Sequence, residues 1–141
     1  MVLLTLKEIL YFIILTGVIG YIFTGIFIKR PRTIYDRMNP KKIKLEDFKF
    51  AVLIAAPAII LHELAHKFVA MGFGVEATFE LFPFGLILGI FLKLIGSPFL
   101  IIAPGYVTIG SEIFANALAY RIIAFAGPAT NLLLWGVSKI V

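Results

Sequence analysis

Long apolar stretches separated by polar segments dominate this chain. Ile9–Ile28 contains no charged residue, and at about 1.5 Å per helical residue it matches the roughly 30 Å core of a bilayer. We expect a retained anchor rather than a signal peptide, because the run exceeds an h-region and no A-x-A site follows. Phe50–Gly72 and Ile122–Val141 are similar in length. Phe84–Ile95 is shorter and ends near a lysine, which predicts a re-entrant or interfacial segment.

The apolar pattern changes its period after the second long stretch. In Val75–Leu81, apolar residues alternate with Glu76, Thr78 and Glu80, which is the period of a strand with one apolar face. Ser97–Ile109 holds two proline-bounded, β-rich pieces that we expect to pair with this strand. Because an open sheet edge cannot face lipid, these strands must lie at the interface or line a wet cavity.

A polar stripe precedes the last apolar stretch. Ser111–Arg121 reads as a short helix in which Ser111 is a cap and Glu112, Asn116 and Tyr120 recur every fourth position.

The elements together predict a mainly α-helical membrane protein. It has three or more transmembrane helices and a small interfacial β-sheet or hairpin after the second one. We expect a single embedded unit over residues 1–141, with an anchor helix and a basic loop in 1–49 and a catalytic core in 50–141.

Composition supports a multi-pass integral membrane protein, and we expect it in the cell membrane. Hydrophobic residues make up 61% of the chain and charged residues 15%. The absence of cysteine excludes disulfides, thiol catalysis and cysteine-based zinc sites. Of the 13 Lys and Arg, eight lie between Lys29 and Lys49, so the net charge of +5 indicates a loop at lipid head groups and no nucleic-acid partner.

The sequence HELAH, residues 62–66, places two imidazoles and a carboxylate inside the second span. Residues four apart on a helix differ by about 40° of rotation and about 6 Å of rise, so His62 and His66 can bind one zinc ion. Glu63 flanks that position without entering the coordination sphere, which suits a general base acting on a zinc-activated water. The predicted reaction is peptide hydrolysis.

The alternative interpretation of HELAH is a set of buried polar residues that neighbouring helices satisfy. Ionisable groups inside a membrane are costly, at roughly 2.5–3.5 kcal/mol each on insertion scales, and are functional by default, which favours the metal site. We expect Lys67, the next residue, to extend its ammonium to the surface.

The chain resembles the site-2 protease family of intramembrane zinc metalloproteases. The resemblance covers most of the chain from Phe50 onward: HELAH in a membrane helix, a strand-rich segment, PGYV at 104–107, and GPATN at 127–131 inside a later span. It implies proteolysis within transmembrane segments of substrate proteins, one zinc per chain, and a catalytic role for Asn131 in binding the substrate carbonyl or its oxyanion. The alternative for GPATN is a kink at Pro128 whose freed carbonyl, that of Ala124, is satisfied by Thr130.

One family feature is missing. The third zinc ligand of the family is an aspartate in a further helix, whereas the aspartates here, Asp36 and Asp47, precede HELAH. Glu76, Glu80 and Glu112 lack family support as ligands. We expect that the chain is the front part of a longer protein. Alternatively, a partner supplies the ligand, or the chain is a degenerate relative.

Two rival functions and the membrane orientation stay open. A catalytically incomplete relative would bind helices or act as an adaptor, and an ion transporter would need polar residues in several spans, whereas Ile9–Ile28 offers Thr16 and Thr24. The basic loop indicates a cytoplasmic position, but the resemblance implies the opposite orientation, which we favour. The sequence specifies neither the oligomeric state nor the identity of the substrate protein.

Overall fold

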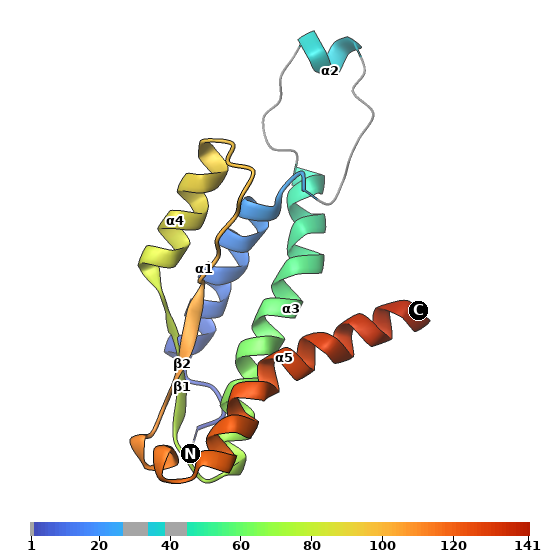
Figure 1. The fold of residues 1–141 in the computed structure, drawn as a ribbon. Coiled ribbons are helices and arrows are strands. Elements are labelled where there is room, and N and C mark those ends of the chain that lie inside the picture. Colours follow the sequence, from blue (N-terminus) through green and yellow to red (C-terminus); the bar gives the residue numbers. More distant parts are fainter. Residues whose placement is uncertain (1, 27–33, 39–44) are drawn as a thin grey trace.

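Three long helices and a two-stranded sheet form the frame of the structure (Figure 1). The computed structural model describes residues 2–26, 34–38 and 45–141. Helices α1 (Leu6–Phe23), α3 (Leu45–Gly72) and α5 (Ala117–Ile140) are long and apolar enough to cross a membrane, so the predicted fold class is confirmed. Within the basic segment 29–49, the structure describes the short helix α2 (Ile34–Met38) and residues 45–49, which form the start of α3. Our expectations for residues 29–33 and 39–44 lie outside the described residues.

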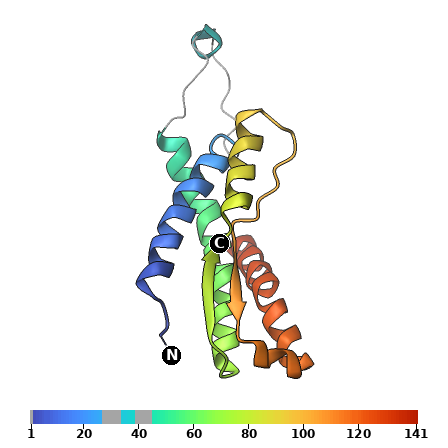
Figure 2. The same ribbon diagram turned by 90° about the vertical axis from the view of Figure 1, so that its left-hand side faces the viewer.

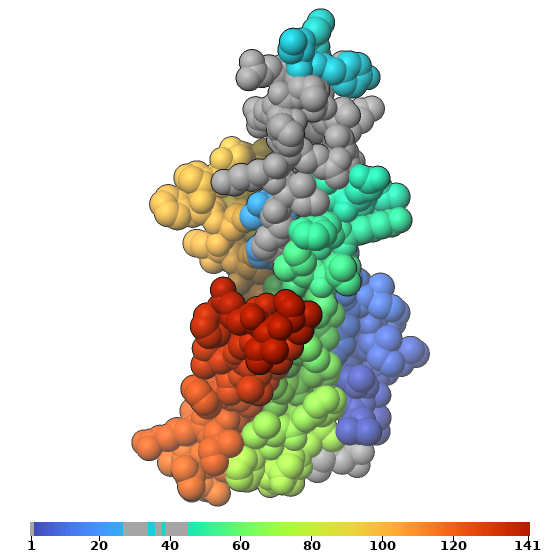
Figure 3. All heavy atoms as spheres, turned by 90° about the vertical axis from the view of Figure 1, so that its right-hand side faces the viewer, coloured from blue at the N-terminus to red at the C-terminus, as the bar shows by residue number. Residues whose placement is uncertain are grey.

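Helix α3 is the central element. Helix α1 runs alongside it, and α5 packs across its C-terminal half on another side (Figure 3). Gly20 lets α1 approach closely, because a Cβ atom there would lie 2.8 Å from the Phe48 ring. The sheet packs against α3, with β1 towards α1 and β2 towards α5 (Figure 2).

Helix α1 begins earlier than the apolar pattern predicts. The Thr5 side chain accepts a hydrogen bond from the Glu8 amide, and the Glu8 carboxylate accepts one from the Thr5 amide, which forms a capping box. The two reciprocal bonds satisfy amides at the helix start. The helix therefore begins at Leu6 and includes two charged residues before Ile9.

The expectation that Lys67 reaches the surface is wrong. Its side chain is 1% exposed, and its Nζ donates to Oε1 of Glu8, which is 0% exposed, at 2.5 Å. The same Glu8 oxygen accepts the Phe79 amide at 2.8 Å. A buried ammonium needs an opposite charge close by, and the Glu8 carboxylate of α1 supplies it.

The sheet confirms one predicted strand and corrects its partner. Strands β1 (Ala77–Leu81) and β2 (Gly105–Ile109) are antiparallel, with Phe79 opposite Val107. Phe79 is fully buried and stacks on Phe12 of α1 at 4.6 Å between ring centroids. Only the second piece of the 97–109 segment is a strand; residues 97–104 return along α4 without regular structure.

The predicted helix over Ser111–Arg121 is also corrected. Residues Ser111–Ala115 form a short 3-10 helix, and Asn116 then caps α5 by accepting the Ala119 amide at 3.0 Å. Asparagine is a strong N-cap residue, so it ends the first element and begins the next. The three polar residues of the expected stripe therefore do not share one helix face.

The short apolar segment is helix α4 (Pro83–Leu94). It packs against α1, and Lys93 donates hydrogen bonds to the carbonyls of Ile22, at 2.9 Å, and Thr24, at 2.7 Å. These carbonyls belong to the C-terminal end of α1, where helical partners are missing and a cation is favourable.

Candidate metal centre

The two histidines of HELAH turn their rings towards each other on α3. The Nε2 atoms of His62 and His66 lie 3.2 Å apart, and the ring planes are inclined by 80°. Two nitrogens bound to one tetrahedral zinc at 2.0–2.1 Å would be separated by about 3.3 Å. The pair therefore has the spacing that a shared zinc ion requires.

A backbone carbonyl of α5 orients His66. Its Nδ1 lies 2.7 Å from the carbonyl oxygen of Ile123, so Nδ1 carries the proton and donates it. Nε2 then keeps its lone pair, which is the form that binds a metal.

Asn131, also in α5, contacts the other histidine. Its amide nitrogen lies 3.1 Å from Nδ1 of His62. Rotating the side-chain amide of Asn131 by 180° exchanges its nitrogen and oxygen. The oxygen then accepts the Nδ1 proton of His62, and Nε2 of His62 is free for a metal. The neighbouring Thr130 hydroxyl donates to Ala126 at 2.9 Å and not to Ala124, which removes the predicted reason for a purely structural GPATN.

Gly127 keeps the space in front of both imidazoles open. It is buried, and a Cβ atom at this position would lie 2.5 Å from Nε2 of His62 and would also meet Nε2 of His66. Such an atom would fill the space that both lone pairs face. The missing side chain therefore leaves room for an ion there.

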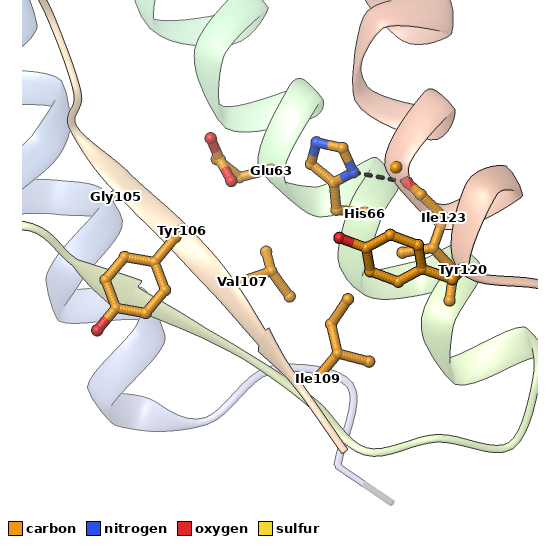
Figure 4. A pocket seen from close by; sticks show the side chains of 9 residues that line it. Glu63, His66, Gly105, Tyr106, Val107, Ile109, Tyr120 and Ile123 are labelled. Atoms are coloured by element: carbon orange, nitrogen blue, oxygen red, sulfur yellow. Dashed lines mark hydrogen bonds between the residues drawn. The ribbon is translucent and has the colours of Figure 1, made fainter. Parts of the chain in front are cut away.

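Glu63 projects beside His66 into a cavity between α3, β2 and α5 (Figure 4). The cavity has a volume of about 290 Å³. Glu63 is 9% exposed and forms no hydrogen bond or ion pair within the described part of the chain. The other residues that line the cavity come mostly from the strand and α5: His66, Gly105, Tyr106, Val107, Ile109, Tyr120, Ile123 and Ala124. The carboxylate is thus available to a molecule in the cavity.

The structure brings the four predicted site residues together at the crossing of α3 and α5. Their catalytic and metal-binding roles stay predictions. Over residues 2–26, 34–38 and 45–141, no group of three His, Cys, Asp or Glu side chains could hold a metal ion. The described part of the chain therefore offers two ligands, and the chemistry of a zinc site requires at least one more.

Several residues that shape the site and its surroundings were missed by the sequence analysis. Gly127 and Pro128 were considered only as part of the GPATN motif and its kink, and Tyr120 only as part of a polar stripe. Glu8, which precedes the predicted anchor, was assigned no role. For Glu8 a signal existed, because Thr5 and Glu8 have the T-x-x-E spacing of a capping box.

Comparison with known proteins links the chain to a metalloprotease. It is 39% identical over 88 residues to a Methanocaldococcus jannaschii protein named as a putative zinc metalloprotease. The match covers 62% of this chain and 44% of that protein, so the chain spans less than half of the relative's length. No family model matches the sequence, and no solved structure matches it.

Proposed function

We propose that this chain is part of a zinc-dependent peptidase that cleaves peptide bonds in membrane-embedded segments of other proteins. The observation that carries the proposal is the 3.2 Å approach of the two Nε2 atoms beside a buried Glu63, unpaired among the described residues, in a helix long enough to span a membrane. The similarity to a protein named as a zinc metalloprotease supports the same chemistry. The order of motifs supports assignment to the site-2 protease class.

Each side chain has a defined task in this proposal. His62 and His66 would hold the ion, which when bound supplies the Lewis acidity that makes water a nucleophile near neutral pH. Glu63 takes the proton of the attacking water and passes it to the leaving amine. With its oxygen on His62, Asn131 still has two N–H donors for the substrate carbonyl or the oxyanion that develops from it.

The position of β2 beside the cavity favours a substrate segment in an extended conformation. A helical substrate must unwind before water can reach its carbonyls, because they are held in helical hydrogen bonds. Residues along β2 line the cavity with Glu63, and β2 pairs with β1 along one edge only among the described residues. An unwound segment could add to the other edge as a further strand. Transmembrane protein segments are therefore the proposed substrates, and the cell membrane is the proposed location.

The missing third ligand belongs to the proposal as well. We propose that an aspartate outside the described residues, from a further segment or a partner, completes the coordination. His62 is half-buried and Asn131 is exposed, so the site has an open side from which a ligand can approach.

Zinc content and cleavage test the proposal together. Wild-type protein, purified together with the segment or partner that carries the third ligand, is expected to contain one zinc per chain by elemental analysis and to cut a Leu/Ala-rich membrane-spanning peptide in detergent. Glu63→Gln should keep the zinc and lose cleavage by about 10²-fold or more, because it removes only the general base. Zinc-free, well-folded wild-type protein, or full activity in Glu63→Gln, would reject the proposal.

A second candidate is a non-catalytic helix-binding or adaptor module. The lack of a three-residue metal group in the described part of the chain favours it. It predicts that wild-type protein and Glu63→Gln bind the peptide equally and that neither cuts it. Binding without zinc in both proteins would support this function over the peptidase.

A further inference from the structure

Lys67 lies one helical turn after Glu63 and yet pairs with a different carboxylate. Positions i and i+4 on a helix are neighbours, and a Glu followed by a Lys at this spacing is a favourable ion pair. In the structure the Lys67 ammonium instead donates to Glu8 of α1 at 2.5 Å, and Glu63 has no ion pair within the described residues. The charge next to the candidate base is thus directed to another helix.

Glu8 is fully engaged in this contact. Its Oε1 accepts from Nζ of Lys67 and from the Phe79 amide at 2.8 Å. Its Oε2 accepts from the Thr5 amide at 2.8 Å and the Thr5 hydroxyl at 3.1 Å. Both oxygens are therefore fixed by groups from α1, α3 and β1. The arrangement holds the carboxylate in one orientation, facing Lys67.

We propose that Glu8 is a positioning residue that keeps the Lys67 ammonium away from Glu63, so that the Glu63 carboxylate stays free to accept a proton. This role rests on the proposed peptidase function. A buried ammonium requires a partner, and without Glu8 the carboxylate available on its own helix face is Glu63. An ammonium bound there would occupy the oxygen that has to receive the proton and would weaken the base.

Carbodiimide cross-linking tests the position of the ammonium without zinc or cleavage. Dicyclohexylcarbodiimide enters membranes and condenses a carboxyl group with a neighbouring amine, and mass spectrometry of the digest identifies the linked residues. In wild-type protein the expected amide joins Glu8 to Lys67. In Glu8→Gln the expected amide joins Glu63 to Lys67. A Glu63–Lys67 amide in wild-type protein overturns the proposal, even if the variant does not fold, and so does its absence in folded Glu8→Gln.

Kinetics separate this role from a merely structural one. Glu8→Gln is expected to lower kcat for the membrane-spanning peptide by about 10²-fold, the usual contribution of a general base, at unchanged zinc content and KM. Glu8→Gln combined with Lys67→Met removes the released ammonium and should restore kcat to within a few-fold of wild type. If the ion pair only holds the helices together, the double variant will be no better than the single one, and the proposal fails.

A matched control exists on α1, the helix that carries Glu8. Lys7→Met breaks the exposed ion pair of Lys7 with Glu80, at 2.8 Å, which also joins α1 to β1. It should change neither the cross-links nor kcat. A wild-type protein without zinc would reject the peptidase function but would leave the cross-linking result to be judged on its own.

Discussion

At the scale of single residues, the two imidazoles depend on three positions of α5. The Ile123 carbonyl fixes the proton of His66, the Asn131 amide contacts His62, and Gly127 leaves the facing space open. None of these groups is a ligand in our proposal. They decide which nitrogen carries a lone pair and whether an ion fits between the two rings.

Gly127→Ala should abolish zinc binding while the protein remains folded. The new methyl group would lie against Nε2 of both histidines, in the space proposed for the ion. Elemental analysis of the purified variant measures this directly. Gly136→Ala in the same helix is the control, because a Cβ there meets nothing within 4 Å and alanine favours a helix by roughly 0.5–1 kcal/mol. Normal zinc content in Gly127→Ala would contradict the placement of the ion.

Asn131→Ala should weaken zinc binding by about 10–100-fold, which is the usual effect of losing a partner of a metal-binding histidine. The reason is that Nδ1 of His62 loses its partner at 3.1 Å and the ring is no longer held in one tautomer. Competition with a chelator of known affinity gives the dissociation constant. Ser138→Ala is a suitable control, because its hydroxyl bonds only within α5, to the Trp135 carbonyl. Equal affinities in the two variants would leave Asn131 with a substrate role alone.

At the scale of elements, polar groups fix where the apolar helices begin, end and meet. Asn116 divides the predicted helix at 111–121 into two elements, because its side chain caps α5. The Thr5–Glu8 capping box begins α1, and Glu8 then connects that helix to α3 and β1. Dispersion and apolar burial alone would allow these helices to slide, whereas directed hydrogen bonds select one register.

Lys93→Met should loosen α4 from α1. The substitution removes two charge-assisted hydrogen bonds to the carbonyls that end α1 and leaves those carbonyls without these donors. The expected loss is about 1.5–3 kcal/mol in free energy of unfolding, the range for hydrogen bonds to charged groups. Denaturant titration in mild detergent measures it. Lys139→Met, which removes an exposed lysine near the Trp135 ring, should change the stability by less than about 0.5 kcal/mol.

At the scale of the whole molecule, α1 and α3 run side by side in opposite directions and α5 leaves the region of the sheet again (Figure 1). The connection from β1 through α4 to β2 runs out and back along α1 (Figure 2). Three helices long and apolar enough to cross a membrane predict that the two ends of the chain lie on opposite sides of it.

Single-cysteine labelling tests this topology and resolves the orientation. The chain has no native cysteine, so Leu3→Cys and Val141→Cys each carry one thiol. A membrane-impermeant maleimide added to intact cells should label one of them and spare the other until the cells are opened. Labelling of Leu3→Cys from outside supports a cytoplasmic basic loop, and protection supports the opposite orientation. Equal labelling of both variants would contradict three crossings.

The local pattern of the sequence was sufficient to predict the main helices, the strand β1 and the two histidines that we propose as ligands. Apolar runs of bilayer length predicted the three long helices, and the period of two predicted β1, because each is decided by neighbours along the chain. The spacing of His62 and His66 predicted their convergence for the same reason, since helical geometry alone sets it.

Contacts between residues far apart in the sequence were decided only by the tertiary structure. Lys67 is buried because Glu8, 59 positions away, supplies its counter-charge. Gly127 matters because α5 crosses α3 at the histidines, and no periodicity of either helix specifies where two apolar surfaces will cross. The free energy of burying apolar side chains depends little on the register between two helices. A few polar contacts therefore select one packing arrangement.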